Sequence, residues 1–382
     1  MRRTYRTLND YEMQHNAEVG LFTRPSNTNF STYKASLRKM VQTNPLVSII
    51  VVTMNKVDLL KNCLDSLYRQ DYEPIEVVVV DNGSYEDVQG MLAKEFPEVR
   101  MIRLDTNHGF AGGNNRGIEI SQGKYIALIN NDALAEPQWI SSMVATAETD
   151  SSIAAVASII IDGNLPEVLD SCGVGIGLDG MSRQSMRGMP VPKLTQAKEV
   201  LLFSGCACLL RLEVLKEVGL FDEDFFSYCE DTDLGLRLRK TGWKIVVAPD
   251  AYVKHFYSMT GGKFSLQKVY WVERNHFWVA IKNLPWFLLV AIPIITVFRY
   301  LAQGYSILKS AGELNQFTKN NHWPAIVSTY FKAYVDMFAK LPDMLRKRRI
   351  ILKKHGLSNL DMFNLIWKFH LSMVEILGMR KR

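Results

Sequence analysis

The chain has 382 residues, of which 47% are hydrophobic and 22% charged, and its formal net charge is +6. This balance is ordinary for a folded protein and excludes a largely disordered chain. The five cysteines are too few and too irregularly spaced for a disulfide framework, and no CxxC pair suggests a zinc site, so a reducing compartment is expected.

Residues 1–45 form a polar leader without clean periodicity that ends at Pro45. Its basic start is followed by no apolar stretch, so it does not resemble a secretory signal, and the chain is expected to stay in the cytoplasm. We expect no catalytic residue in this leader.

Beyond Pro45, short apolar and β-branched runs alternate with helical or glycine-rich segments. The segment from Leu59 to Leu67 has helical spacing, and Asn55 is a candidate cap for it. This alternation predicts an α/β fold with a parallel, Rossmann-like sheet and helices on both faces. The runs that we expect to be its strands are 47–52, 75–80, 99–104 and 125–129.

Polar residues directly follow three of these runs, as Thr53 to Asn55, Asp81 to Ser84 and Asn130 to Asp132. Because ligands bind beyond the carboxyl ends of parallel strands, the three groups are expected to line one site. Each group alone is equally consistent with an ordinary turn.

Asp81 can accept hydrogen bonds from a base N–H or a ribose hydroxyl. Dinucleotide-dependent oxidoreductases use the same position, but residues 53–56 lack the glycine-rich turn that they need after the first strand. The glycines of 109–117 match neither GxGxxG nor the Walker pattern. They predict a tight turn that opens a helix, with free backbone N–H groups and Arg116 as a possible phosphate partner.

Asp132 provides a hard oxygen that can hold a divalent ion together with diphosphate oxygens and waters. Such an ion would neutralise a departing diphosphate. His255 follows a predicted strand at 243–248 and is a second candidate for a metal or diphosphate contact, although a lone histidine is usually structural.

Segment 221–234 places acidic residues among aromatic and aliphatic ones, a setting that raises a carboxylate pKa and suits a general base. Asp231 and Asp233 are alternatively caps of a helix beginning near Thr232. The glycine-rich segment 162–192, with Arg183 and Arg187, is a candidate mobile loop over donor phosphates or acceptor.

The composition becomes aromatic and apolar after about residue 265. Segment 284–298 has 15 residues and two prolines, where a spanning helix needs about 20, so it predicts a re-entrant or interfacial helix. A buried core or dimer helix is the alternative. The tail 340–382 has 11 Lys and Arg against 3 Asp and Glu, interleaved with apolar residues, which suits an anionic membrane better than nucleic acid. A solvated helical face is the alternative for this tail.

This ordered set of motifs resembles the family 2 glycosyltransferases, in particular their bacterial rhamnosyltransferase-like branch. The resemblance implies a GT-A fold, a nucleoside-diphosphate sugar donor, Mg²⁺ or Mn²⁺, and inversion at the anomeric carbon. It covers about residues 46–260, through the segments 47–51, 80–84, 107–117, 130–132, 219–223 and 230–234 and through His255.

The resemblance also assigns roles to residues. It implies that Asp132 and His255 contact the metal, with Asn130 standing where the family pattern has its first aspartate. It implies that Asp231 is the catalytic base, with Glu230 as the fallback. The residues expected to bind the nucleotide sugar are Thr53, Asn55, Asp81, Asn82, Asn107, Gly109, Asn114, Arg116 and Asn131.

The implied enzyme moves a sugar, with rhamnose among the candidates, from a dTDP-, UDP- or GDP-sugar to a polyprenyl-diphosphate-linked saccharide in O-antigen or other cell-surface polysaccharide synthesis. It is expected at the cytoplasmic face of the inner membrane as a peripheral or monotopic protein. Its expected parts are the leader 1–45, a GT-A catalytic domain 46–265 and a membrane-associating helical region 266–382. A nucleic-acid partner is not expected, and a homodimer is left open.

The alternative function is a non-catalytic nucleotide-sugar-binding subunit of a membrane polysaccharide complex. The presence of Asp132 and of the pair Glu230 and Asp231 argues against this alternative.

Overall fold

The computed structural model describes residues 44–256, 265–308, 317, 321–354 and 356–377. The chain divides into two compact units, 1–44 and 45–382, and the elements described below belong to the second. The polar leader expected at 1–45 therefore lies, except for its last two residues, outside the described residues.

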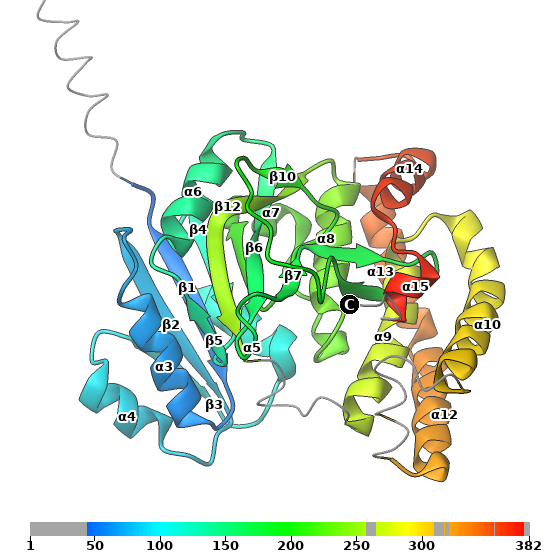
Figure 1. The fold of residues 1–382 in the computed structure, drawn as a ribbon, viewed down its shortest axis with the longest axis horizontal. Coiled ribbons are helices and arrows are strands. Elements are labelled where there is room, and N and C mark those ends of the chain that lie inside the picture. The colour runs from blue at the N-terminus through cyan, green and yellow to red at the C-terminus, as the bar shows by residue number, and fades with distance from the viewer. Residues whose placement is uncertain (1–43, 257–264, 309–316, 318–320, 355, 378–382) are drawn as a thin grey trace, which may run out of the picture. The chain divides into compact units, whose positions relative to one another are not determined.

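A sheet of ten strands forms the centre of the second unit (Figure 1). The strand order is β10-β12-β6-β11-β4-β1-β2-β3, and β5 and β7 pair with β12 and β6. The pairs β4/β1, β1/β2, β2/β3 and β12/β6 are parallel, whereas β11 is antiparallel to both of its neighbours. The strands are β1 (Val47–Thr53), β2 (Ile75–Asn82), β3 (Arg100–Leu104), β4 (Tyr125–Ile129), β5 (Ala133–Ala135), β6 (Ile153–Asp162), β7 (Leu169–Cys172), β10 (Lys198–Glu199), β11 (Ala207–Arg211) and β12 (Lys244–His255).

The expected α/β fold with a mostly parallel sheet is thus confirmed. The central strands are buried on both faces, which is why they read as continuous apolar runs. In the parallel register of β1 and β2, Thr53 lies opposite Asp81, so the polar residues that end these strands emerge at the same level. A separate two-stranded ribbon joins β8 (Val174–Ile176) and β9 (Ser182–Gln184).

Helices cover both faces of the sheet. One hydrophobic cluster packs one face against α3 (Val57–Leu67), α4 (Val88–Glu95) and α6 (Trp139–Glu148). A second cluster packs the other face against α5 (Gly109–Ile120), α7 (Leu212–Val218) and α8 (Glu230–Lys240). A short 3-10 turn, η1 (Glu223–Phe225), precedes α8.

The helices after β12, apart from the short last one, share a third hydrophobic cluster, which includes the buried Trp278 and extends to Leu236 of α8 and Ile176 of β8. The first of them packs directly on α8, the helix that carries the acidic pair. The helices after β12 are α9 (Leu266–Asn283), α10 (Trp286–Leu308), α12 (Trp323–Ala339), α13 (Leu341–Lys353), α14 (Asn359–Phe369) and α15 (Met373–Ile376). A domain boundary at residue 265 stays a prediction.

The expectation that Asn55 caps α3 is wrong. Asn55 and Lys56 both adopt left-handed backbone conformations, with φ of 63° and 61°. The Asn55 side chain instead accepts hydrogen bonds from the backbone N–H groups of Tyr85 and Glu86. The Glu86 carboxylate accepts from the N–H of Val57, so a group distant in sequence caps the helix.

Candidate active site

The polar ends of β1, β2 and β4 meet through hydrogen bonds. Asn131 donates from Nδ2 to Thr53 Oγ1 over 2.9 Å, and Thr53 donates to the backbone oxygen of Asn55. The N–H of Asn55 donates to Ser84 Oγ over 2.7 Å, which connects this group to the loop after β2. Residues from three strand ends therefore form one continuous polar layer at the carboxyl edge of the sheet.

Asp81 is fully buried at the end of β2. Its Oδ1 accepts a hydrogen bond from the N–H of Ser84. Arg103 forms an ion pair with Oδ2 at 3.1 Å, but this oxygen has no hydrogen-bond partner among the described residues. This buried oxygen faces a cation without a hydrogen bond to it, and a donor such as a base N–H would supply one.

The turn before α5 is fixed by Asn82, which donates from Nδ2 to Asn107 Oδ1 and to the backbone oxygen of Gly109, both over 3.0 Å. Gly109 has a φ of +70°, and a Cβ there would lie 2.2 Å from the backbone oxygen of Phe226. Only glycine fits this close approach. The predicted tight turn is thus locked to the loop that precedes the acidic pair.

Two further predicted donor-binding residues lie within α5. Asn114 is buried and donates from its side chain to the backbone oxygen of Phe110. Arg116 lies two turns into the helix and pairs with Glu223 at 3.0 Å and Glu119 at 3.3 Å. The geometry thus gives Arg116 a carboxylate partner, and its contact with phosphate stays a prediction.

Asp132 and His255 are adjacent, with 3.4 Å between Oδ1 and Nε2. The other ring nitrogen of His255 lies 2.9 Å from Asp170 Oδ2, and Arg187 pairs with Asp170 at 3.3 Å. Burial lowers the pKa of His255, but neighbouring Cys206 and hydrogen bonds to Asp132 and Asp170 outweigh this effect, so the pKa is raised. Asp170 is not among the site residues predicted from the sequence.

These residues fit a divalent cation in part. A carboxylate and an imidazole whose second nitrogen faces another carboxylate form a common ligand arrangement. No group of three or more His, Cys, Asp or Glu side chains in the described ranges could hold a metal ion. Diphosphate oxygens and waters would therefore have to complete the coordination.

The acidic pair lies at the start of α8, which begins at Glu230 rather than near Thr232. Asp231 accepts hydrogen bonds from the N–H of Gly205 at 2.9 Å and of Thr232 at 2.7 Å. Burial raises the pKa of Asp231, although these backbone bonds oppose the shift. Burial and the charge of Asp231 raise the pKa of Glu230 well above its usual value, and Glu230 Oε2 has no described hydrogen-bond partner. Asp231 retains a partly exposed surface, whereas Glu230 is buried.

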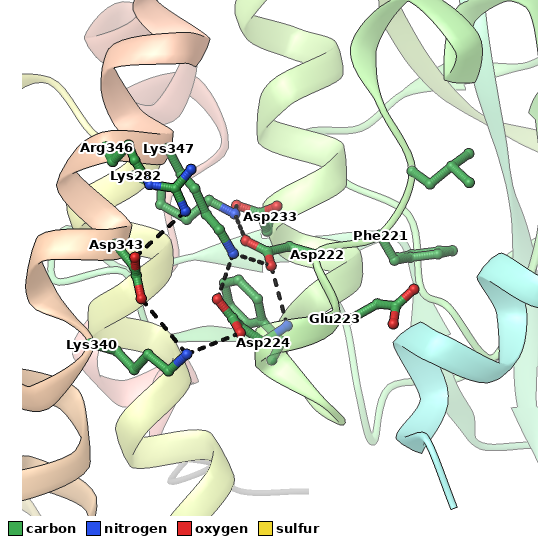
Figure 2. A network of polar contacts seen from close by, with 12 residues as sticks. Phe221, Asp222, Glu223, Asp224, Asp233, Lys282, Lys340, Asp343, Arg346 and Lys347 are labelled. Atoms are coloured by element: carbon green, nitrogen blue, oxygen red, sulfur yellow. Dashed lines mark hydrogen bonds and ion pairs between the residues drawn. The ribbon is translucent and has the colours of Figure 1, made fainter.

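The third acidic residue of this helix, Asp233, has a different setting (Figure 2). It is fully buried between Lys282 at 2.7 Å and Arg237 at 2.9 Å. Its pKa is held well below its usual range because the two cations outweigh the effect of burial. Lys282 also pairs with Asp222 at 2.6 Å, so α9 is joined to α8 and to the residues before η1. Asp233 therefore forms internal ion pairs instead of capping the helix.

The loop between η1 and α8 is strained. Phe226, Tyr228 and Cys229 have φ between 65° and 69°, a conformation that costs a non-glycine residue roughly 1–2 kcal/mol. The buried Asn275 of α9 stabilises the loop by donating to the backbone oxygens of Phe225, Ser227 and Tyr228. The rings of Phe226 and Tyr228 then lie against Trp271. The role of Asn275 could not be predicted from the sequence because its partners are carbonyl groups, which have no sequence signature.

Segment 162–192 contains β7, β8 and β9. Its two arginines have separate partners. Arg187 pairs with Asp170 beside His255, whereas Arg183 donates to the backbone oxygen of Ile376 over 3.0 Å. Arg187 is thereby placed next to the candidate metal ligands, and the mobility of the segment stays a prediction.

The mixed α/β sheet and its polar strand ends are those of the GT-A class of glycosyltransferase fold. The sequence models "Glycosyl transferase family 2" and "Glycosyl transferase family group 2" match residues 48–219 and 179–314. The chain belongs to the family 2 glycosyltransferases. A crystal structure of GalNAc-T7 with UDP, GalNAc and Mn²⁺ has the same fold, at a TM-score of 0.53 and 16% identity, over 63% of this chain and 48% of that one.

Two curated relatives illustrate the range of similar proteins. The O-antigen biosynthesis protein RfbC of Myxococcus xanthus is 26% identical over 66% of this chain and 20% of its own length. The N-acetylglucosaminyl-diphospho-decaprenol L-rhamnosyltransferase of Mycobacterium tuberculosis is 27% identical over 57% of this chain and 78% of its own length. The chain spans a fifth of RfbC and a quarter of an uncharacterised Sinorhizobium fredii protein to which it is 28% identical.

Proposed function

We propose that this chain is an inverting glycosyltransferase. It transfers a sugar from a nucleoside-diphosphate donor to a hydroxyl of a lipid-linked saccharide during cell-surface polysaccharide synthesis. The observation that carries the proposal is the arrangement of acidic residues. Asp81 lies in the polar layer at the carboxyl edge of the sheet with an oxygen that has no described hydrogen-bond partner, Asp132 adjoins His255, and the partly exposed Asp231 has a raised pKa.

In this mechanism Asp81 accepts a hydrogen bond from the base or ribose of the nucleotide sugar. Asp132 with His255 would hold Mg²⁺ or Mn²⁺. When bound, the ion neutralises charge on the departing diphosphate. Asp231 takes the proton from the hydroxyl of the acceptor saccharide. The oxygen of that hydroxyl attacks the anomeric carbon from the face opposite the diphosphate. One displacement inverts the configuration. Glu230 is the fallback for the base, although its burial makes it harder to reach.

The acceptor class rests on two observations. A relative acts, by its name, on N-acetylglucosaminyl-diphospho-decaprenol, and the C-terminal helices of this chain carry exposed apolar side chains. Both favour a polyprenyl-diphosphate-linked acceptor and a location at the cytoplasmic face of a membrane. The name of this relative, an L-rhamnosyltransferase, favours rhamnose as the sugar that this chain transfers.

A hydrolysis screen over UDP-, dTDP- and GDP-sugars, with and without Mg²⁺ or Mn²⁺, tests the proposal. We expect release of one nucleoside diphosphate at least tenfold above background, stimulated by a divalent ion and abolished by chelation. If no donor is cleaved and the chain still binds a nucleotide sugar, the alternative of a non-catalytic binding subunit replaces the enzyme.

A further inference from the structure

Helix α10 exposes one apolar side. Among the described residues, one helix, Trp286–Tyr305, has the length and composition to cross a membrane. Only 22% of its apolar window is buried. Its exposed large side chains recur at spacings of one, three and four residues, as on one helical face, and they are Trp286, Val290, Ile294, Val297, Phe298, Leu301 and Tyr305.

Helix α12 has a second apolar stripe of the same kind, which sequence analysis did not identify. Its exposed large side chains are spaced three or four residues apart, and they are Trp323, Val327, Phe331, Val335 and Phe338. Isolated exposed apolar residues are normal, but a contiguous apolar surface marks an interaction site.

The two stripes belong to one surface. Tyr300 of α10 packs against Tyr330 of α12 and shares a hydrogen bond of 2.8 Å with Tyr334, so the helices lie side by side (Figure 1). Each helix turns its other side inward, since Ile292 and Met337 belong to the same buried cluster. The stripes therefore lie on the outer side of the pair. We call this surface, formed by the twelve side chains named above, the α10/α12 face.

A buried ion network excludes a spanning role for α10. Arg299 is fully buried within this helix and pairs with Glu273 of α9 and Asp179 of the β8–β9 turn, both at 2.8 Å. Moving α10 across a bilayer would separate these charges or carry them into hydrocarbon, and either change is costly. The helix is thereby fixed to the body of the enzyme with only its outer side available.

The next helix supplies charge beside the face. Helix α13 contacts α12 and exposes Leu345 and Ile350 together with Arg346, Arg349 and Lys353. Lys347 of this helix and the neighbouring Lys340 instead pair with Asp222 and Asp224 within the chain. Apolar side chains next to exposed cations suit the headgroup region of an anionic bilayer.

We propose that the α10/α12 face lies in the plane of an anionic lipid bilayer, inserted into one leaflet, with α13 at the headgroups. The chain is then monotopic, and no helix of the described residues spans. This proposal rests on the proposed function, from which it takes the lipid-linked acceptor. It deepens that function because this surface brings the enzyme to the leaflet that holds such an acceptor.

Vesicle flotation of the full chain tests the surface. We expect binding to phosphatidylcholine vesicles containing phosphatidylglycerol and at least tenfold weaker binding to vesicles of phosphatidylcholine alone. The double variant Ile294→Asn, Phe331→Asn should bind the phosphatidylglycerol-containing vesicles at least tenfold more weakly. The matched control, Tyr68→Asn with Leu165→Asn, changes exposed apolar residues elsewhere and should leave binding unchanged. Equal loss in both double variants, or dimerisation through the α10/α12 face without vesicle binding, overturns the proposal.

The orientation is tested by depth-dependent quenching of a fluorophore attached at Val290→Cys or Leu301→Cys, since the five native cysteines are buried. An in-plane helix gives both positions the same depth. A spanning helix separates them by about 16 Å, at roughly 1.5 Å per residue, and that result overturns the proposal. Donor hydrolysis by the Ile294→Asn, Phe331→Asn variant should match wild type. Absence of hydrolysis in wild type contradicts the proposed function alone, because flotation is independent of it.

Discussion

At the scale of single residues, neighbouring carboxylates have opposite properties. Burial raises the pKa of Asp231, whereas Lys282 and Arg237 hold the pKa of Asp233 low. The two side chains lie two positions apart on α8, so local sequence does not separate them. Their partners do, because Asp231 accepts hydrogen bonds from two backbone N–H groups and from the Thr232 hydroxyl, whereas Asp233 pairs with two cations. This difference favours Asp231 as a base and gives Asp233 a structural role.

The raised pKa predicts the pH dependence of transfer. A base acts only when deprotonated, so activity falls as the pH decreases through the pKa of Asp231. Because burial raises this pKa, the acid limb of kcat/KM should lie above the ordinary aspartate value of about 3.9. A profile of kcat/KM for the acceptor from about pH 3 to 9 measures it. An acid limb at or below the ordinary value would contradict this account.

The two arginines of segment 162–192 provide a matched pair. Arg187→Gln removes a cation beside Asp170 and His255, so we expect donor affinity to fall about tenfold, or about 1.4 kcal/mol. Arg183→Gln removes a contact with Ile376, away from these ligands, and should change donor affinity less than twofold. Calorimetric titration with the nucleoside diphosphate compares them. Equal effects would remove Arg187 from the donor site.

At the scale of elements, the strands could be predicted because buried parallel strands are continuous apolar runs. The expected strands at 75–80 and 125–129 correspond to β2 and β4. The site was harder to predict because much of it depends on distant contacts. Asp170, Asn275 and Lys282 act through partners on other elements, and the cap of α3 comes from Glu86. Short sequence motifs identify the polar residues at strand ends. They do not identify the distant residues whose hydrogen bonds and ion pairs position the site.

Lys282 illustrates how α9 supports the acidic helix. Replacing Lys282→Met leaves Asp222 and Asp233 without this shared cation in a buried setting, so we expect unfolding free energy to fall by on the order of 3 kcal/mol. Lys124→Met breaks an exposed pair with Glu148 and should cost less than about 1 kcal/mol. Urea unfolding measures both variants. Equal losses would show that the buried pair contributes no more than a surface one.

At the scale of the whole molecule, the helices after β12 support both the site and the proposed membrane surface. Helix α9 holds the strained loop through Asn275 and the acidic helix through Lys282, and it packs against α12. The same helix therefore lies between the candidate base and the α10/α12 face. Removing residues 266–382 should consequently disturb the site itself, rather than only its attachment to a membrane.

The most direct test of the central claim is the configuration of the product sugar, followed by proton NMR during transfer to an N-acetylglucosaminyl diphosphate with a short alkyl chain. With the donor selected by the hydrolysis screen, wild type should give a product inverted at the anomeric carbon. Asp231→Asn should transfer at least a thousandfold more slowly while binding donor within twofold of wild type. A retained configuration, or full turnover by Asp231→Asn, would contradict the account.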